Sequence, residues 1–515
     1  MTPLMAGPSM ALGSDPSLAH SEKSLPPLPN VDRYKTITTR FAPNPDFVLH
    51  LGSIRAIILS HDYAQMYKGR FLLRFDDTDP RLKKSSIEYY DLIREDVRWL
   101  ECQWNEEYIA SDRIPIYYEH AEQVLKTGHA YVCTCTPDDF RLNINSGRGC
   151  PDRSNSLEQN LSGWQRMLEG GFSEGEAVLR IKTDLAHPNP AVRDWPALRI
   201  IDPEKYPHPR VGSKYRVWPL FNFGSAIDDH LLSVSHVIRG KEHLTNAVRT
   251  EFLYKAFGWK IQDYVHYGRL KATDIKLSKS LMVREVEEGL VDGYSDPRLP
   301  TIAALRRRGY VPSALRKIVY EMGPRPVDAT VSWDNVNATN RKEIDKIASR
   351  YSFIASPLTI HVSGVDRTFD ASLPLHPEKP QLGNRTFKVV PNNGTANLLI
   401  SSRDVDLLKK SKVVRLMELF NVEVKNVGSN SITAAFHSQD YMKAREVKAP
   451  LVNWLPEKDN LTGEVVMPDA SRTGGQVEAN IRRERVGSII QMVRFGFGRI
   501  DSISDDLVTV YYAHR

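Results

Sequence analysis

The sequence has little cysteine, no long apolar run and no recognisable targeting signal. Only 4 of its 515 residues are cysteine, too few for a disulfide framework, so we expect a reducing compartment and assign the protein to the cytoplasm. No stretch approaches eighteen uncharged apolar residues, which argues against a membrane span. Residues 1–34 are rich in Pro, Ser, Ala and Gly and lack a basic start followed by an apolar core, so we expect a disordered tail.

The composition is that of an ordinary soluble protein, with 41% apolar and 26% charged residues. The length allows three or four domains, each with its own core. The net charge of +6 fits a polyanionic partner, but such an excess is also common among proteins that bind none. The motifs therefore have to identify the function.

The stretch "TTRFAPNPDFVLHLGSIRAIILSHDYAQMYKGRFLLRFDDTDP" from 38 to 80 changes character three times. Residues 35–42 alternate branched and polar side chains as a strand does, and two prolines then end regular structure. Ser53 is a candidate N-cap for a one-sided apolar helix that Gly69 closes, and 70–75 read as an apolar strand. Strand, helix and strand at this spacing predict a βαβ unit in a parallel sheet.

Ligands bind at the carboxyl ends of such strands, where the first helix directs its free amide groups. We therefore expect His50 and Gly52 to lie beside a phosphate, with His50 donating a hydrogen bond and Gly52 allowing close approach. Asp76, Asp77 and Asp79 end the next strand at the same edge, where a carboxylate could hold an ammonium group. A loop histidine and turn-capping acids explain the same spacing equally well.

Two segments resemble the signatures of one enzyme family. "RFAPNPDFVLHLGS" resembles the HIGH signature region of class I aminoacyl-tRNA synthetases, and "LLRFDDTDP" resembles the segment that follows it in glutamyl- and glutaminyl-tRNA synthetases. The stretch 268–280, "GRLKATDIKLSKS", contains a near match to the second signature, KMSKS. The likeness extends over 36–450, and the chain resembles glutamyl-tRNA synthetases of the archaeal type.

The resemblance implies an enzyme that joins glutamate to ATP, accompanied by Mg²⁺, and releases pyrophosphate. The glutamyl group then passes to the terminal adenosine of tRNA(Glu) and, in some members, of tRNA(Gln). Positioning and neutralisation of the triphosphate would fall to His50, Gly52, Ser278 and Lys279. Alone, the second signature would read as a solvated basic loop, and its pairing with the first favours catalysis.

The resemblance also assigns the nucleotide contacts. The first signature ends in Ser53, where many class I enzymes have histidine. We therefore expect His50 to make more of the contacts with phosphate. The residues expected to bind ATP are Asn44, Pro45, His50, Gly52, Ser53, Gly240, Arg269, Leu270, Leu277, Ser278 and Lys279.

The charge of the substrate side chain distinguishes glutamate from glutamine. A buried cation that meets the side-chain carboxylate of glutamate would be left unpaired by glutamine. Arg239 stands where glutamyl enzymes carry arginine and glutaminyl enzymes carry a small uncharged residue, so the resemblance implies glutamate. The alternative role for Arg239 is an ordinary ion pair with Asp228, Asp229 or Glu242.

The other residues expected at the glutamate pocket follow from the same resemblance. Asp76 matches the acid that holds the α-amino group. Phe221 and Ser225 depart from the tyrosine and asparagine of relatives. The full set is Arg40, Asn44, Asp76, Phe221, Ser225 and Arg239.

Residues 129–214 form an insertion between two halves of the catalytic domain, 35–128 and 215–283. It resembles the domain that grips the acceptor stem of tRNA. Cys133, Cys135 and Cys150 fall in one short segment, which predicts a tetrahedral zinc. Asp152 replaces the histidine of relatives and is the poorer fourth ligand, so three buried or free thiols are the alternative.

The C-terminal half changes from helical to strand-like patterning. Apolar residues at helical spacing predict a helical domain over 284–340, and the three arginines at 306–308 are expected at exposed positions, facing tRNA or water. Alternating runs after Tyr351 predict antiparallel β-barrels over 341–515, which read the anticodon in the archaeal-type family.

The expected fold is thus α/β plus all-β: a split Rossmann-like catalytic domain with an α+β insertion, a helical domain and C-terminal β-barrels. The expected partners are L-glutamate, ATP and tRNA, with no membrane, and we expect a monomer. Two other functions stay open: a glutaminyl-tRNA synthetase and a catalytically silent paralogue that only binds tRNA.

Overall fold

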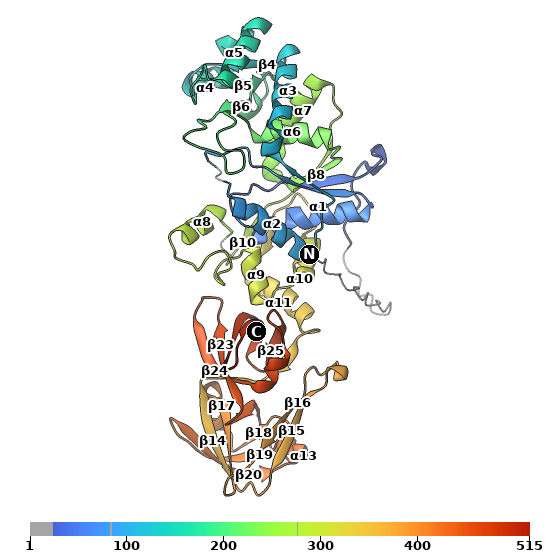
Figure 1. Cartoon of the computed structure of the whole chain (residues 1–515). Helices are drawn as coiled ribbons and strands as arrows, with labels where there is room; N and C mark the ends of the chain where they lie inside the picture. Colours follow the sequence, from blue (N-terminus) through green and yellow to red (C-terminus); the bar gives the residue numbers. More distant parts are fainter. Residues whose placement is uncertain (1–23, 83–84, 276) are drawn as a thin grey trace, which may run out of the picture.

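The computed structural model describes residues 24–82, 85–275 and 277–515 and is elongated (Figure 1). The insertion lies at one end and the parallel sheet next to it. The helices of the C-terminal half lie in the middle, and two β-barrels form the other end. Within these described ranges, no helix has the length and apolar character needed to cross a membrane.

The two catalytic halves contribute two parallel sheets that are hydrogen-bonded edge to edge. The first contains β1 (Thr38–Phe41), β2 (Arg70–Phe75) and β3 (Glu106–Ile109), and the second contains β8 (His236–Gly240) and β9 (Asp263–Tyr267). β1, β2 and β3 pair in parallel, as do β8 and β9. The amide of Ser235 donates to Thr38 O at 2.9 Å and joins β8 to β1. The carboxyl ends of all five strands therefore meet at one edge, the usual ligand side of such a sheet.

The helix of the first signature begins directly after Ser53, the predicted N-cap position, but without the capping hydrogen bond. α1 (Ile54–Met66) follows a short 3₁₀ helix, η2 (Leu51–Ser53), and Ser53 makes no side-chain capping bond. A Cβ added at Gly69 would lie 1.9 Å from the backbone oxygen of Ile37, so glycine is required where the chain returns to the sheet.

Residues 24–34, predicted as part of a disordered tail, pack on the catalytic domain instead. Leu25 and Leu28 are buried in its core, and the Tyr34 hydroxyl donates to a carboxylate of β9 at 2.7 Å. The tail boundary predicted from composition is wrong because a few apolar and aromatic side chains suffice to anchor a proline-rich segment. The rest of the predicted tail, 1–23, lies outside the described residues.

The insertion is a four-stranded antiparallel sheet covered by helices. The sheet contains, in spatial order, β4 (Ala130–Cys133), β5 (Val178–Ile181), β6 (Pro196–Ile200) and β7 (Val217–Pro219). The helices in and around it are α3 (Ile114–Lys126), α4 (Pro137–Asn145), α5 (Leu157–Glu169), α6 (Phe221–Leu231) and α7 (Leu244–Phe257). Because β7 belongs to this sheet, the insertion extends beyond the predicted boundary at 214.

Short helices connect the catalytic sheet to the barrels. They are α8 (Lys279–Glu287), α9 (Ile302–Arg308), α10 (Pro312–Met322) and α11 (Trp333–Ile344), with the parallel pair β10 (Leu270–Ala272) and β11 (Ala329–Val331) beside them. The prediction that the three arginines of α9 are exposed is wrong. Arg306 pairs with Glu95 of α2 (Ile87–Trp99), Arg307 with Asp501, and Arg308 is 4% exposed, because this helix turn is enclosed by other domains.

Two seven-stranded sheets close into barrels in the same way, because the two edge strands of each are consecutive in the chain. In the proximal barrel the edge strands β12 (Ser349–Tyr351) and β13 (Phe353–Ala355) follow one another in the chain, separated by Ser352. In the distal barrel the edge strands β21 (Leu451–Val452) and β22 (Trp454–Pro456) are separated by Asn453. Ser352 Oγ donates to Asn453 Oδ1 at 2.9 Å, so the two kinks join the barrels to each other.

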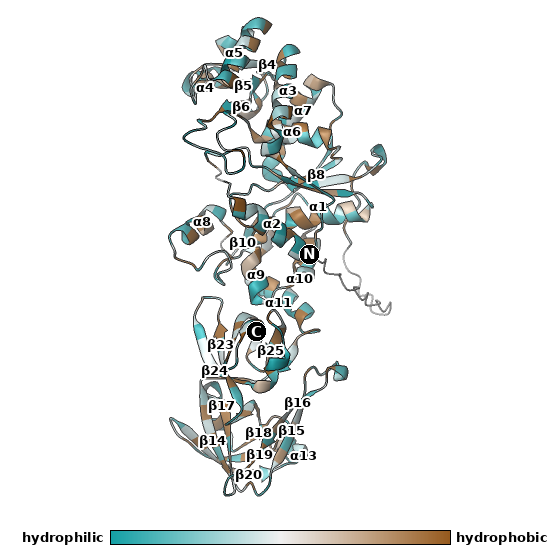
Figure 2. Ribbon diagram, viewed as in Figure 1, coloured by the Kyte–Doolittle hydropathy of each residue, from teal (hydrophilic) through white to brown (hydrophobic). Residues whose placement is uncertain are grey.

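The remaining barrel strands are mainly antiparallel, with parallel pairs such as β14 with β20 and β23 with β27. In the proximal barrel they are β23 (Asn460–Val466), β24 (Arg472–Glu478), β25 (Ile489–Met492), β26 (Gly496–Ile503) and β27 (Leu507–His514). In the distal barrel they are β14 (Pro357–Ser363), β17 (Thr395–Ser401), β18 (Val413–Leu416), β19 (Asn421–Val427) and β20 (Ser431–Ser438), with the hairpin β15 (Phe369–Pro374) and β16 (Asn384–Val389) and the helices α12 (Val405–Lys410) and α13 (Tyr441–Glu446) beside them. Apolar and polar residues alternate along these strands (Figure 2), as the sequence pattern predicted.

Candidate active site

The two signature segments lie together at the ligand edge of the sheet. Lys279, the first residue of α8, forms an ion pair through Nζ with Asp46, which lies 233 residues away in the loop after β1. The charge of Lys279 also contributes, after burial, to the lowered pKa of His50. The structure therefore brings His50 and Lys279 to one site, as the order of the signatures predicted.

A buried arginine that the sequence did not single out ties these segments to each other. Arg55, on the first turn of α1, is 1% exposed. Its Nη1 donates to Gly268 O at 2.7 Å, just before the second signature, and its Nη2 donates to Gly323 O at 2.6 Å, at the end of α10. Its cost of burial is offset because these oxygens satisfy the guanidinium donors.

His50 is held as a neutral hydrogen-bond donor. Its Nδ1 accepts from the Gly52 amide at 3.0 Å, and burial together with the positive charge of Lys279 lowers the pKa of His50 to about 4. Since Nδ1 is an acceptor, the ring proton of the neutral form lies on Nε2, which can donate to a phosphate oxygen. A Cβ at Gly52 would lie 2.7 Å from His50 Cε1, so glycine keeps the ring in this position.

Arg239 is a buried guanidinium without an ion-pair partner in the described part of the chain. It is the next-to-last residue of β8 and is 8% exposed, and its Nε and Nη2 are buried with no acceptor. No ion pair with Asp228, Asp229 or Glu242 is found in the described part of the chain, so the alternative role is not observed. Burial, and then the charge of Arg40, lower the pKa of Arg239 to about 10. Its Cζ lies 5.1 Å from the centre of the Tyr264 ring.

Arg40, at the same edge on β1, is by contrast neutralised. It donates from Nε and Nη2 to the two carboxylate oxygens of Asp229, at 2.9 and 3.0 Å, and Nη2 lies 3.5 Å from Ser225 Oγ. Burial disfavours its charge, but Asp229 more than compensates and raises the pKa of Arg40. The unpaired positive charge of the pocket therefore belongs to Arg239.

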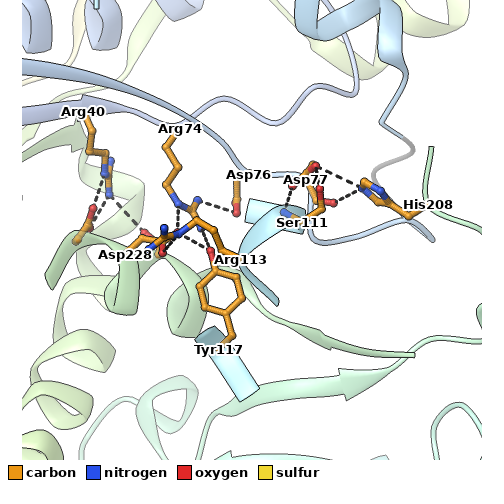
Figure 3. A network of polar contacts seen from close by, with 11 residues as sticks. Arg40, Arg74, Asp76, Asp77, Ser111, Arg113, Tyr117, His208 and Asp228 are labelled. Atoms are coloured by element: carbon orange, nitrogen blue, oxygen red, sulfur yellow. Dashed lines mark hydrogen bonds and ion pairs between the residues drawn. The ribbon is translucent and has the colours of Figure 1, made fainter. Parts of the chain in front are cut away.

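Figure 3 shows Arg40 together with a charged network centred on Asp228. Asp228 is fully buried and accepts from Arg74 Nε at 2.6 Å, Arg113 Nε at 2.7 Å and the Tyr117 hydroxyl at 2.5 Å. Arg74 Nη1 also donates to Asp76 at 3.0 Å. Arg74 therefore holds the carboxylate of Asp76 in one orientation.

The other two acids at the end of β2 have structural partners. Asp77 is fully buried and accepts from the Ser111 amide at 2.8 Å and the Tyr90 hydroxyl at 2.6 Å. Asp79 pairs with Arg199 of the insertion at 2.7 Å. Asp79 Oδ1 also accepts from the Leu82 amide at 3.0 Å and so caps a turn, as the structural interpretation predicted, whereas Asp77 binds residues distant in the chain.

The remaining residues expected at the nucleotide differ in burial. Pro45 is buried, Leu277 packs against the main core, and a Cβ at Gly240 would lie 2.2 Å from a Glu242 oxygen. Ser278 precedes α8, and Leu270 begins β10. Arg269 is not buried at the site. Its side chain is 64% exposed, and its Nε lies 4.0 Å from Glu242 Oε2.

Several pocket residues on other elements carry unsatisfied polar atoms. The Oδ1 atoms of Asn44 and Asn222 are buried without a donor, and Nε2 of His266 is buried without a partner. Burial and the charge of Arg239 lower the pKa of His266 to about 4. Phe221 packs at 5.7 Å, centre to centre, from the ring of His243.

Sequence reasoning missed Asn222, His266 and Tyr264. Tyr264 and His266 stack with ring centres 5.7 Å apart on one face of β9. Period-two alternation in the strand before the second signature was a usable signal for these two.

The cysteines of the insertion form a compact cluster. Cys133 Sγ and Cys150 Sγ are 3.6 Å apart, and Cys135 Sγ lies 3.8 Å from Asp152 Oδ2. One ligand atom from each of the four residues lies within 4.8 Å of the others. Thiolates bound to tetrahedral zinc at about 2.3 Å lie about 3.8 Å from each other, so this geometry fits the metal. Asp152 is also held by the Thr134 amide at 2.7 Å.

Comparison with known proteins bears on the identity of this site. Residues 36–346 match the catalytic domain of the family "tRNA synthetases class I (E and Q)", and residues 348–439 match its anti-codon binding domain. A glutamate–tRNA ligase of Pyrococcus furiosus is 49% identical over 497 residues, 96% of this chain and 85% of that one. A glutamate–tRNA ligase of Methanopyrus kandleri is 43% identical over 502 residues, 98% and 87% of the two chains. A crystal structure of a glutamate tRNA ligase from Elizabethkingia meningosepticum aligns at 21% identity with a TM-score of 0.44, over 61% of this chain and 70% of that one, too distant a likeness to bear on function. The chain belongs to the class I tRNA synthetases of the glutamyl and glutaminyl (E and Q) group.

Proposed function

We propose that the protein is a glutamate–tRNA ligase that activates L-glutamate with ATP and transfers it to the 3′-terminal adenosine of tRNA(Glu). The observation that carries this proposal is the buried, unpaired guanidinium of Arg239 at the ligand edge of the sheet. A side-chain carboxylate would supply its missing acceptor and counter-charge. The neutral amide of glutamine would leave the charge uncompensated, so a glutaminyl-tRNA synthetase is not favoured.

In this proposal, the amino acid binds between the ends of β1, β2 and β8. Arg239 binds the side-chain carboxylate, with Arg40, Phe221 and Ser225 lining the pocket. Asp76, held by Arg74, binds the α-ammonium group, and the buried oxygen of Asn44 accepts a further hydrogen bond. These contacts leave the α-carboxylate directed at the nucleotide.

The first reaction is attack of the α-carboxylate on the α-phosphorus of ATP, which forms glutamyl-adenylate and releases pyrophosphate. His50 donates from Nε2 to the phosphate oxygens, while Lys279 and Ser278 hold the triphosphate from the other side. Asn44, Pro45, Gly52, Ser53 and Gly240 approach the nucleotide with backbone or small groups, and Arg269, Leu270 and Leu277 lie on the base side. Mg²⁺ accompanies ATP. For Lys279 to reach the phosphates, its ion pair with Asp46 has to open.

The second reaction is attack of the terminal ribose of tRNA on the adenylate. The insertion would grip the acceptor stem, and the barrels over 341–515 would read the anticodon, in keeping with the family description of 348–439. We propose tRNA(Glu) as the substrate and a monomeric enzyme, and the charging assay below decides whether tRNA(Gln) is a second substrate.

We also propose that Cys133, Cys135, Cys150 and Asp152 hold a structural zinc, because their ligand atoms are close enough for a tetrahedral site. The metal would fix the segment after α4, which carries Cys150 and Asp152, to the end of β4. Metal analysis of the purified protein tests this: about one zinc per chain is expected, and a Cys133→Ser variant should lose it. Metal-free protein with three reduced thiols would contradict the proposal.

Aminoacylation with labelled glutamate tests the function. Purified enzyme, ATP and either tRNA(Glu) or tRNA(Gln) transcript are mixed, and charging is followed with glutamate and, separately, with glutamine. We expect glutamate on tRNA(Glu) and no glutamine on either tRNA. Binding of tRNA without charging would instead identify a silent paralogue.

A further inference from the structure

The three arginines of α9 and its bridge to the first signature point to a role that the substrate contacts do not include. We infer that the proximal barrel positions His50 through α9, with Arg307 as the positioning residue. The inference rests on the proposed function in that its readout is the activation of glutamate.

The amino end of α9 is hydrogen-bonded to the loop that carries His50. Leu51 N donates to Pro300 O at 2.9 Å, and Ile302 N donates to Leu49 O at 3.0 Å, so His50 lies in a two-stranded bridge with Thr301. Thr301 is fully buried and caps α9, accepting from Ala304 N at 3.1 Å. The backbone on both sides of His50 is therefore fixed to the start of this helix.

The carboxyl end of α9 is bonded to two strands of the proximal barrel. Arg307 donates from Nε and Nη2 to both oxygens of Asp501 on β26, at 2.9 and 2.8 Å, and its Cζ lies 4.0 Å from the centre of the Tyr511 ring. Arg308 donates to the carbonyl oxygens of Tyr512 and Ala513 on β27, at 3.1 and 2.8 Å. A bidentate guanidinium contact has a defined direction, so it transmits position as well as charge.

Between these ends, α9 is short and packed. A helix of this length spans about 10 Å at about 1.5 Å per residue, and Ile302, Ala304 and Leu305 are fully buried. A small displacement of the barrel therefore reaches Leu49 and Leu51 directly. Reacting groups misplaced by about 1 Å can lose about 10²-fold in rate, so a partial loosening should cost less.

The same geometry gives the bound tRNA a route to the catalytic centre. If the barrels hold the anticodon end, as proposed, their docked position is passed to His50 along one helix. The sheet and the insertion need not move. Arg307 is a positioning residue because its contacts lie in the proximal barrel and at Ser295, in the segment before α9, apart from the residues assigned to ATP and glutamate.

The test uses full-length protein and three changes. Arg307→Ala removes the link, and Arg307→Asp combined with Asp501→Arg restores it with reversed charges. Arg494→Ala is the control, because Arg494 belongs to the same barrel and its carboxylate partner, Asp404, lies beside the distal barrel and not on α9. For each, kcat and the KM for ATP are measured in ATP–pyrophosphate exchange with glutamate and tRNA present, and thermal unfolding is recorded.

We expect Arg307→Ala to lower kcat by about tenfold while the KM for ATP stays within about twofold, because the nucleotide contacts are intact and His50 is misplaced. The reversed pair should recover most of kcat, and Arg494→Ala should match the wild type. Unchanged kcat in Arg307→Ala, or no recovery in the reversed pair, would overturn the inference even when the wild type charges tRNA(Glu) normally. If Arg307→Ala does not fold, Arg307→Lys and Asp501→Asn replace it and are judged by the same criterion.

Discussion

The two sides of the amino-acid pocket carry the same buried group in opposite electrostatic states. On the β1 side, Asp229 neutralises Arg40 and raises its pKa, whereas on the β8 side Arg239 has no carboxylate partner in the described chain and its pKa is lowered to about 10. An arginine that already has its partner stabilises the fold. Burial of an arginine without a partner lowers the stability of the fold, and an anionic ligand that binds to it offsets this loss.

The largest effect should follow from removing the partner of Arg40. Asp229→Ala leaves a buried cation unpaired, and breaking such a pair costs about 3–5 kcal/mol of unfolding free energy. Urea unfolding measures this loss. In the matched control, Arg239→Met, the unfolding free energy should stay level or rise, because an uncompensated charge is removed. An equal loss in both variants would show that the two arginines are not in different states.

The same comparison applies at the phosphate side of the site, where Lys279 is paired with Asp46. Lys279→Ala should lower the rate of glutamyl-adenylate formation by at least about 10², the amount lost with one transition-state donor. Single-turnover measurement of adenylate formation tests this. Near-normal kinetics would mean that Lys279 does not act on the triphosphate.

A smaller effect of opposite sign is expected on the other partner of that pair. Asp46→Asn frees Lys279 without removing its charge. The pair is half-exposed, and such pairs contribute about 0.2–1 kcal/mol, so the KM for ATP should fall by about two- to fivefold at most. If the KM instead rises, Asp46 contributes to ATP binding and does not compete with it.

The last prediction concerns pH. Burial, together with neighbouring positive charge, lowers the pKa values of His50 and His266 to about 4, below the unfolded value of about 6.5. The unfolded chain therefore binds protons first as pH falls, so stability is retained above about pH 6.5 and declines toward pH 4. Urea unfolding over this range should show a smaller decline in His266→Gln than in the wild type. Identical slopes would contradict the lowered pKa of His266.

Much of the catalytic framework could be predicted because its signals are local. The strand that became β2, the helix that became α1 and the glycines beside them follow from side-chain period and turn chemistry. The pairing of Arg40 with Asp229 could not be predicted, since the partners lie 189 residues apart in the sequence and either Asp228 or Asp229 would have fitted the pattern. The enclosure of Arg308 and the packing of Leu25 likewise depend on distant elements that no local pattern reports.

The most direct test of the selection by charge is ATP–pyrophosphate exchange with glutamate and with glutamine, in the presence of tRNA(Glu), for the wild type and for Arg239→Met. We expect exchange with glutamate and none with glutamine in the wild type, and a loss of at least about 10² with glutamate in the variant at undiminished stability. Comparable exchange with both amino acids, or a variant that activates glutamate nearly as well as the wild type, would contradict the account.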